Sequence, residues 1–151
     1  MNESKFESLK SQTTTSATET MQLAAKFAKT LKGGELISLI GDLGAGKTTF
    51  TRGLVEALGG VVGVKSPTFT VMNEYTVQAG SIKRVVHVDF YRFTQASELE
   101  ALALEDEHRP DTVIVAEWPD VLGHSLVVPD ITVTFKHLNL DEREILITDV
   151  V

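Results

Sequence analysis

The sequence predicts an α/β fold in which a mostly parallel sheet is flanked by helices and carries an antiparallel edge at its C-terminal end. Apolar runs alternate with helical patterns along the chain, and a glycine-rich stretch, "GDLGAGKTTF" at 41–50, directly follows one of these runs. In two segments near the C-terminal end, apolar and polar residues alternate. Strands buried on both faces give continuous apolar runs, whereas half-exposed antiparallel strands alternate, so the two patterns indicate the two parts of the sheet.

Composition limits the classes of protein that fit. The chain has 151 residues, 42% apolar and 23% charged, which is typical of one globular domain spanning 1–151. Its net charge of −7 argues against binding DNA or RNA through bulk electrostatics. There is no cysteine, which excludes disulfides and cysteine-bound zinc. The sequence contains neither a membrane-length apolar stretch nor a signal peptide, so we expect a soluble cytoplasmic protein with no membrane contact.

The first half of the chain predicts a helix, a strand and a second helix. Ser16 and Glu19 have the spacing of a capping box, and the helix that they begin runs to about Leu31, before two glycines. "ELISLI" at 35–40 is typical of a buried strand. "KTTFTRGLVEALGG" at 47–60 predicts a helix that again ends in glycines.

The second half predicts mostly strands. The segments 66–77 and 82–92 are two strands, and 95–107 is a helix. "DTVIVAEW" at 111–118 is a buried strand, and the alternating segments 130–138 and 143–150 pair as the antiparallel edge.

Residues 41–48 fit the pattern G-x-x-x-x-G-K-[ST], with a buried strand before it and a helix after it. Glycines let backbone N–H groups approach phosphate oxygens, and the N-terminus of the helix adds positive charge. The lysine supplies a full charge for the β- and γ-phosphates, and the following threonine can bind Mg²⁺. A simple glycine-rich turn is disfavoured because motif and context both match. The sequence thus predicts a nucleoside triphosphate site in a P-loop NTPase-type fold, formed by Gly41, Asp42, Leu43, Gly44, Ala45, Gly46, Lys47, Thr48 and Thr49.

Four residues outside this loop are further candidates. Asp89 and Glu117 each end an apolar strand, so one could hold the metal while the other orients a water nucleophile; either could also be merely the first solvated residue. Thr68, after Pro67, is either a residue that senses the γ-phosphate or an ordinary strand start. Trp118 is either a core residue or, if Pro119 turns the chain out of the sheet, a side chain across the mouth of the site.

Several short stretches of the sequence match motifs of one known family, and they occur in order along the chain. "GDLGAGKTTFTRGL", "SPTFTVMNEY", "HVDFYR" followed by "ELEAL", and "EWPD" together closely resemble the bacterial TsaE (YjeE) family over roughly residues 14–120. The phosphate loop alone is unspecific, and the other matches carry the resemblance. The stretch 103–112 departs from it, being short and without the expected glycine turn.

The resemblance implies an ATPase of tRNA threonylcarbamoyladenosine (t6A) biosynthesis that uses ATP/ADP and Mg²⁺. Such a protein acts with TsaB and TsaD partners on adenosine 37 and meets tRNA only indirectly. By motif, Lys47 and Thr48 bind phosphate and Mg²⁺, and Asp89 and Glu117 are the essential acids. The general logic of two acids at a metal site, rather than the resemblance, favours Glu117 as the metal ligand. Thr68 then lies in a switch-like segment, and Trp118 lies near the nucleotide.

Three other functions use the same loop. A small P-loop kinase normally needs a lid that bears arginines, and arginine is sparse here. A GTPase would need a guanine-reading segment, and this sequence contains none. A nucleotide-gated binding module would show negligible hydrolysis. Without an obvious stimulatory arginine we expect slow basal hydrolysis, with the arginine supplied by a partner or, in cis, by Arg92.

Overall fold

The computed structural model describes residues 10–42, 44–60, 72–89, 106–118 and 128–149. These residues form one seven-stranded sheet in the order β1-β7-β6-β2-β5-β4-β3. The central strands β6, β2, β5 and β4 are parallel, and the outer pairs β3–β4, β6–β7 and β7–β1 are antiparallel. The predicted fold class is confirmed. The strands are β1 (Ser11–Thr14), β2 (Leu36–Ile40), β3 (Met72–Ala79), β4 (Ile82–Asp89), β5 (Thr112–Trp118), β6 (Ile131–His137) and β7 (Arg143–Asp149).

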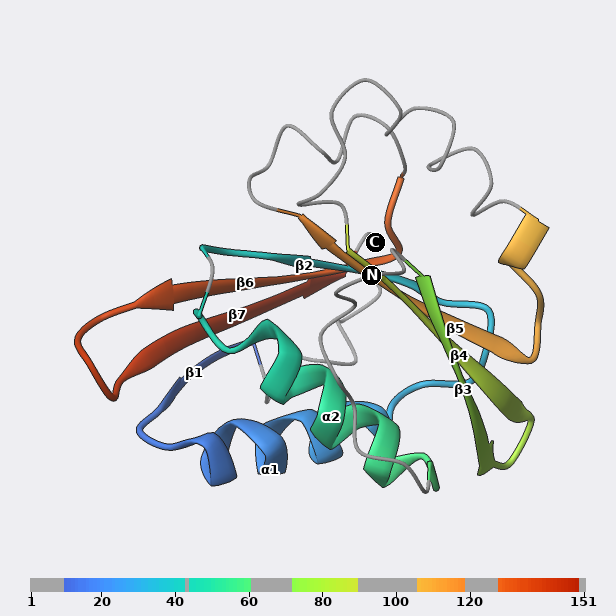
Figure 1. Ribbon diagram of the computed structural model, residues 1–151, viewed down its shortest axis with the longest axis horizontal. Coiled ribbons are helices and arrows are strands. Elements are labelled where there is room, and N and C mark those ends of the chain that lie inside the picture. The colour runs from blue at the N-terminus through green and yellow to red at the C-terminus, as the bar shows by residue number, and fades with distance from the viewer. Residues whose placement is uncertain (1–9, 43, 61–71, 90–105, 119–127, 150–151) are drawn as a thin grey trace, which may run out of the picture.

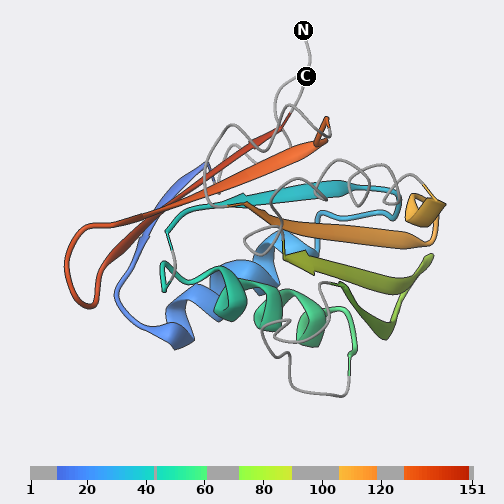
Figure 2. The same ribbon diagram turned by 45° about the horizontal axis from the view of Figure 1, so that its top comes forward.

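Helices α1 (Ala17–Ala28) and α2 (Lys47–Ala57) lie side by side on one face of this sheet (Figure 1; Figure 2). The main core fills the space between the helices and the sheet, and three phenylalanine rings run through it. The ring centroid of Phe50 lies 5.7 Å from that of Phe27 and 5.5 Å from that of Phe135. Burying aromatic side chains is the largest single apolar contribution that such a core offers. The phosphate-loop helix is therefore anchored to α1 and to β6.

The opposite face of the sheet has its own apolar cluster. Alternation along the strands sends successive side chains to the two faces, so the buried strands contribute to both cores. This is why "ELISLI" and "TVIVAEW" are continuous apolar runs. The cluster consists of Leu36, Ile40, Val86, Val88, Ile114, Ala116 and Trp118, with Met72 packed against it.

Most predicted elements are found. Ser16 is the N-cap of α1 and accepts a hydrogen bond from the backbone N–H of Glu19, as the capping-box spacing predicts. The helix ends at Ala28, a turn earlier than expected. The strands β6 and β7 pair as predicted. Of the helix predicted over 95–107, only 106–107 are described, and they are helical. Within the described ranges no helix is long and apolar enough to cross a membrane.

One strand was not predicted. β1 is the polar stretch "SQTT", and it pairs antiparallel with β7. Its last residue, Thr14, is buried, and its hydroxyl lies 2.8 Å from that of Thr20 in α1. The strand is therefore held by backbone pairing and one buried side-chain hydrogen bond, neither of which leaves an apolar pattern in the sequence.

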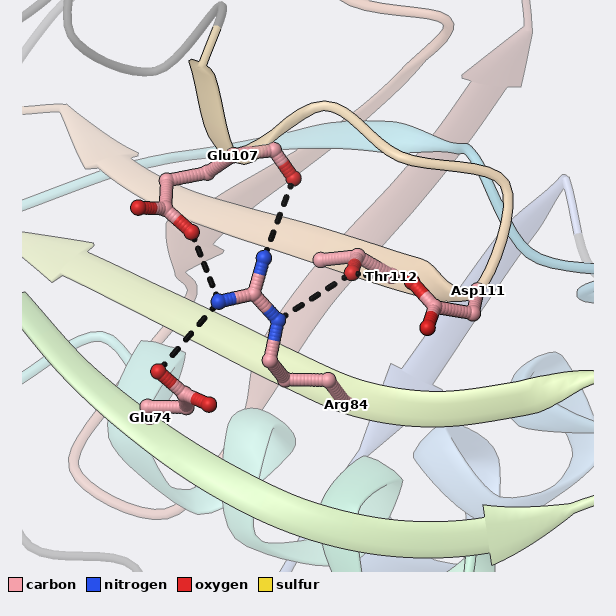
Figure 3. Close-up of polar contacts among 5 residues, drawn as sticks. All are labelled: Glu74, Arg84, Glu107, Asp111 and Thr112. Atoms are coloured by element: carbon pink, nitrogen blue, oxygen red, sulfur yellow. Dashed lines mark hydrogen bonds and ion pairs between the residues drawn. The ribbon is translucent and has the colours of Figure 1, made fainter.

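A charged cluster ties together the starts of β4 and β5 (Figure 3). The Arg84 guanidinium lies 2.6 Å from the carboxylate of Glu107 and 3.2 Å from that of Glu74, and its Nε donates to the hydroxyl of Thr112. Burial acts to lower the pKa of Arg84, but the two carboxylates outweigh it and raise that pKa above its usual value. The cluster lies at the amino ends of these strands, away from the phosphate loop, and is a structural feature.

Candidate functional site

The glycine-rich loop leaves the carboxyl end of β2 and leads directly into α2. Gly44 and Gly46 have φ of +79° and +108°, the left-handed region where a side chain would be strained. Gly46 is also the N-cap of α2, and no side chain caps that end. A helix start that lacks a side-chain cap suits an anion, because its first N–H groups and the helix dipole both favour negative charge.

Lys47, the first residue of α2, is only 5% exposed. Its ammonium group donates hydrogen bonds to the backbone carbonyls of Gly41 and of Asp42, the latter at 2.8 Å. Burial lowers the pKa of Lys47, and the negative charges of Glu117, Asp42 and Asp89 oppose that shift only in part. A buried ammonium group at the start of α2, beside the glycine-rich loop, is well placed to bind phosphate.

Asp89 is the last residue of β4 and Glu117 the last but one of β5, and the two are direct register partners in these neighbouring parallel strands. Leu39 of β2 is the partner of Glu117 on its other side. Alternation from Val113 and Val115, which belong to the helix-side core, places the carboxylate of Glu117 on the face that carries α2. The structure therefore brings together the loop lysine and both predicted acids at the carboxyl ends of the central parallel strands. The two acids are 6% and 3% exposed, so they are buried rather than solvated strand ends.

The donors at this site fit a magnesium ion. Mg²⁺ prefers hard oxygen ligands, and the carboxylates and the Thr48 hydroxyl supply them. The Oε1 atom of Glu117 is buried and has no hydrogen-bond partner in the described part of the chain, so this carboxylate can take a further partner. The described residues contain no group of three or more His, Cys, Asp or Glu side chains that could hold a metal, so phosphate and water oxygens would complete the coordination.

Trp118 differs from its predicted placement. β5 continues regularly through this residue, whose Cα pairs with that of Ile40, so the chain does not leave the sheet before it. The indole is 2% exposed, packs in the cluster on the face away from the helices, and donates from Nε1 to the Ser38 hydroxyl at 3.2 Å. Its contact with nucleotide stays a prediction. Thr68 and Leu43 lie outside the described residues.

Three residues near the site were not predicted from the sequence. His87 lies two positions before Asp89 on the same strand face, and strand alternation alone could have suggested it. At the tip of the β6–β7 hairpin, the His137 ring lies 3.0 Å from the carbonyl oxygen of Gly44. The Arg143 side chain packs against Gly46, with its Cδ 3.2 Å from where a Cβ would stand. The hairpin reaches the loop across more than ninety residues, and no local pattern announces that contact.

Comparisons with known proteins show which family and which fold this chain resembles. A family profile described as "Threonylcarbamoyl adenosine biosynthesis protein TsaE" matches residues 14–145. The Bacillus subtilis tRNA threonylcarbamoyladenosine biosynthesis protein TsaE is 38% identical over 132 residues, 87% of this chain and 80% of that protein. Its namesake from Streptomyces coelicolor is 46% identical over 98 residues, covering 64% and 65% of the two chains. The crystal structure of Bacillus subtilis YdiB superposes with a TM-score of 0.70 at 33% identity, covering 93% of this chain and 85% of that one.

Proposed function

This chain belongs to the TsaE family of threonylcarbamoyl adenosine biosynthesis proteins, and from that premise we propose that it is a Mg²⁺-dependent ATPase. ATP binds at residues 41–49 and is hydrolysed slowly. The energy of binding and hydrolysis serves the formation of t6A in tRNA, carried out with TsaB- and TsaD-type partners. The chain itself neither modifies tRNA nor touches it directly.

The observation that carries the proposal is the surrounding of Lys47. Its ammonium group is buried, is held by two loop carbonyls, and faces the two acids that end β4 and β5. Loop carbonyls are weak partners for a full charge, and triphosphate oxygens would replace them with charge-assisted bonds. Triphosphate oxygens bound to Lys47 in this way would also lie at the start of α2, where no side chain caps the helix.

Within this site Thr48 and Glu117 would hold the metal, and Asp89 would orient the attacking water. A bound Mg²⁺ would neutralise charge that develops on the transferred phosphoryl group. The buried carboxylates need such a cation, because Lys47 alone cannot balance both. Lys47 would steady the β- and γ-phosphates through the reaction.

A thermal-shift titration tests binding. At 100 times the dissociation constant a ligand adds about 2.7 kcal/mol to stability, which for a chain of this length is about 5–11 °C in melting temperature. We expect that shift with Mg·ATP for the wild type and none for Lys47→Met. A folded Lys47→Met protein with unchanged ATP affinity would overturn the assignment. A transfer of phosphate to a small molecule, rather than to water, would favour the kinase.

A magnesium titration distinguishes the roles of Glu117 and Asp89. We expect Glu117→Gln and Asp89→Asn each to lose hydrolysis, since both carboxylates act on the reacting phosphate. The Mg²⁺ dependence of ATP affinity should fall further in Glu117→Gln, because that change removes a direct ligand. A larger fall in Asp89→Asn would exchange the two roles.

The cellular role is tested by complementation. A bacterium depleted of its own TsaE should regain t6A in its tRNA when it carries the wild-type chain, but not when it carries Lys47→Met. Purified TsaB and TsaD should raise the hydrolysis rate of the wild type. If t6A is restored equally by both chains, the nucleotide site is not needed for the pathway.

A further inference from the structure

His87 is the one histidine of the described residues that lies fully buried, at 0% exposed. It is in β4 and belongs to the helix-facing side of the sheet, between Val85 and Asp89 on that face. Its strand neighbour in β5 is Val115. Neither ring nitrogen has a hydrogen-bond partner among the described residues. A buried imidazole in this condition is unusual, because buried polar groups are nearly always bonded.

The ring lies against the carboxylate of Glu117. Its Nε2 atom is 3.4 Å from Oε1 of Glu117, the carboxylate oxygen that also has no hydrogen-bond partner. This separation is within reach for electrostatic attraction but beyond a normal N–H···O hydrogen bond, which spans 2.7–3.2 Å. A displacement of about half an ångström would therefore satisfy both atoms at once.

Packing alone does not account for a histidine here. An unbonded buried polar group costs about 1–3 kcal/mol, whereas an aliphatic side chain would fill the same place between valines without that cost. The register confines the ring to a position beneath Glu117, diagonal across the β4–β5 pair. Metal-binding carboxylates are in general held by an outer hydrogen bond that fixes their orientation.

We propose that His87 is a positioning residue, whose Nε2–H donates to Oε1 of Glu117 and turns the other carboxylate oxygen toward the metal bound with nucleotide. The bond closes when Mg²⁺ and nucleotide draw Glu117 into place. This inference rests on the proposed function, since it needs Glu117 to act at a metal.

The test compares His87→Leu, which removes the donor, with His87→Gln, whose amide N–H can stand near the position of Nε2. Val85→Ala is the matched control, because it removes buried volume from the same face of β4 without touching Glu117. For each protein the affinity for ADP is measured with and without Mg²⁺, and the affinity for Mn²⁺ in the presence of ADP by electron paramagnetic resonance. Melting temperatures are recorded alongside.

We expect His87→Leu to lose about tenfold in Mn²⁺ affinity, the usual effect of removing an outer-shell partner. Its ADP affinity without metal should be unchanged and its melting temperature equal to or above that of the wild type. His87→Gln should recover most of the metal affinity. Val85→Ala should be less stable with wild-type metal affinity. Unchanged Mn²⁺ affinity in His87→Leu, or equal losses in His87→Leu and His87→Gln, would overturn the inference while leaving the ATPase proposal intact.

A second measurement does not depend on a variant that folds. In wild-type protein labelled with ¹⁵N-histidine, adding Mg²⁺ and ADP should give His87 a protonated Nε2, assigned by the signal that His87→Gln lacks. An unprotonated Nε2 in that complex would overturn the hydrogen bond. Wild-type protein that binds no nucleotide at all would instead overturn the proposed function, and the inference with it.

Discussion

Replacing Gly53 by alanine adds a methyl group where helix α2 packs closely against α1. A Cβ on Gly53 would stand 2.7 Å from the backbone oxygen of Met21, 2.8 Å from its Cα and 3.0 Å from the Cβ of Ala24. Carbon atoms pack at about 3.5–4.0 Å, so the helices would have to separate by roughly 0.5–1 Å. Two of the three contacts are to backbone, which cannot move aside as a flexible side chain can.

Two effects oppose each other in this substitution. Overpacking in a core costs about 1–3 kcal/mol, and contacts this short to backbone favour the upper end. Alanine recovers about 1 kcal/mol over glycine through its higher helix propensity. The net loss in the free energy of unfolding is therefore about 2 kcal/mol, or about 4–8 °C in melting temperature for a chain of this size.

Urea unfolding followed by circular dichroism measures the change. Glu56→Ala, on the exposed side of the same helix, is the control and should stay within about 0.5 kcal/mol of the wild type. Adding Ala24→Gly to Gly53→Ala relieves one of the three contacts, so a double-mutant cycle should show favourable coupling. Gly53→Ala with stability equal to or above the wild type would refute the close approach of the two helices.

Three further predictions follow from charge and burial. Burial lowers the pKa of Lys47 in the folded chain below the 10.5 of the unfolded chain. Between the lowered pKa and 10.5 the unfolded chain therefore binds more protons than the folded one, and the free energy of unfolding rises with pH. Urea titrations at alkaline pH should show this rise in the wild type relative to Lys47→Met. Arg84→Met should cost about 2–3 kcal/mol because it strands the partly buried Glu107, whereas Glu74→Gln, at an exposed partner, should change stability by less than about 0.5 kcal/mol. Trp118 should emit as a buried indole; nucleotide contact would alter this emission in the wild type but not in Lys47→Met, and an unaltered wild-type spectrum at saturation would leave Trp118 a core residue.

The strand, glycine-rich loop and helix around residues 41–48 could be predicted because everything that this arrangement requires is local. Its fixed positions fall within eight residues, and the strand and helix on either side announce themselves by their own patterns. The same holds for the N-cap at Ser16, where a hydroxyl and the N–H of Glu19 are three residues apart. Interactions of this kind join residues that are close in the sequence, so the sequence alone predicts them.

Contacts between segments far apart in the sequence could not be predicted. β1 is polar, and its stability comes from pairing with β7, at the other end of the chain. The contact between His137 and the carbonyl of Gly44 requires the β6–β7 hairpin to lie beside β2, which no pattern near either residue specifies. Tertiary partners decide such elements, so single-sequence patterns favour a loop in their place.

The placement of Trp118 shows why a correct local rule led to a wrong geometry. Pro119 predicts that the chain leaves the sheet, yet a proline restricts the residue before it to extended conformations, which are those of a strand. β5 therefore stays regular through Trp118, and alternation sends the carboxylate of Glu117 to the helix face and the indole to the opposite face. The same alternation in β4 puts His87 and Asp89 on the side of Glu117. One pair of parallel strands thus places His87, Asp89 and Glu117 on the helix face and part of the second apolar cluster on the other. Because Trp118 is fixed to Ser38 of β2, the second core holds the backbone that presents Glu117 to the phosphate loop.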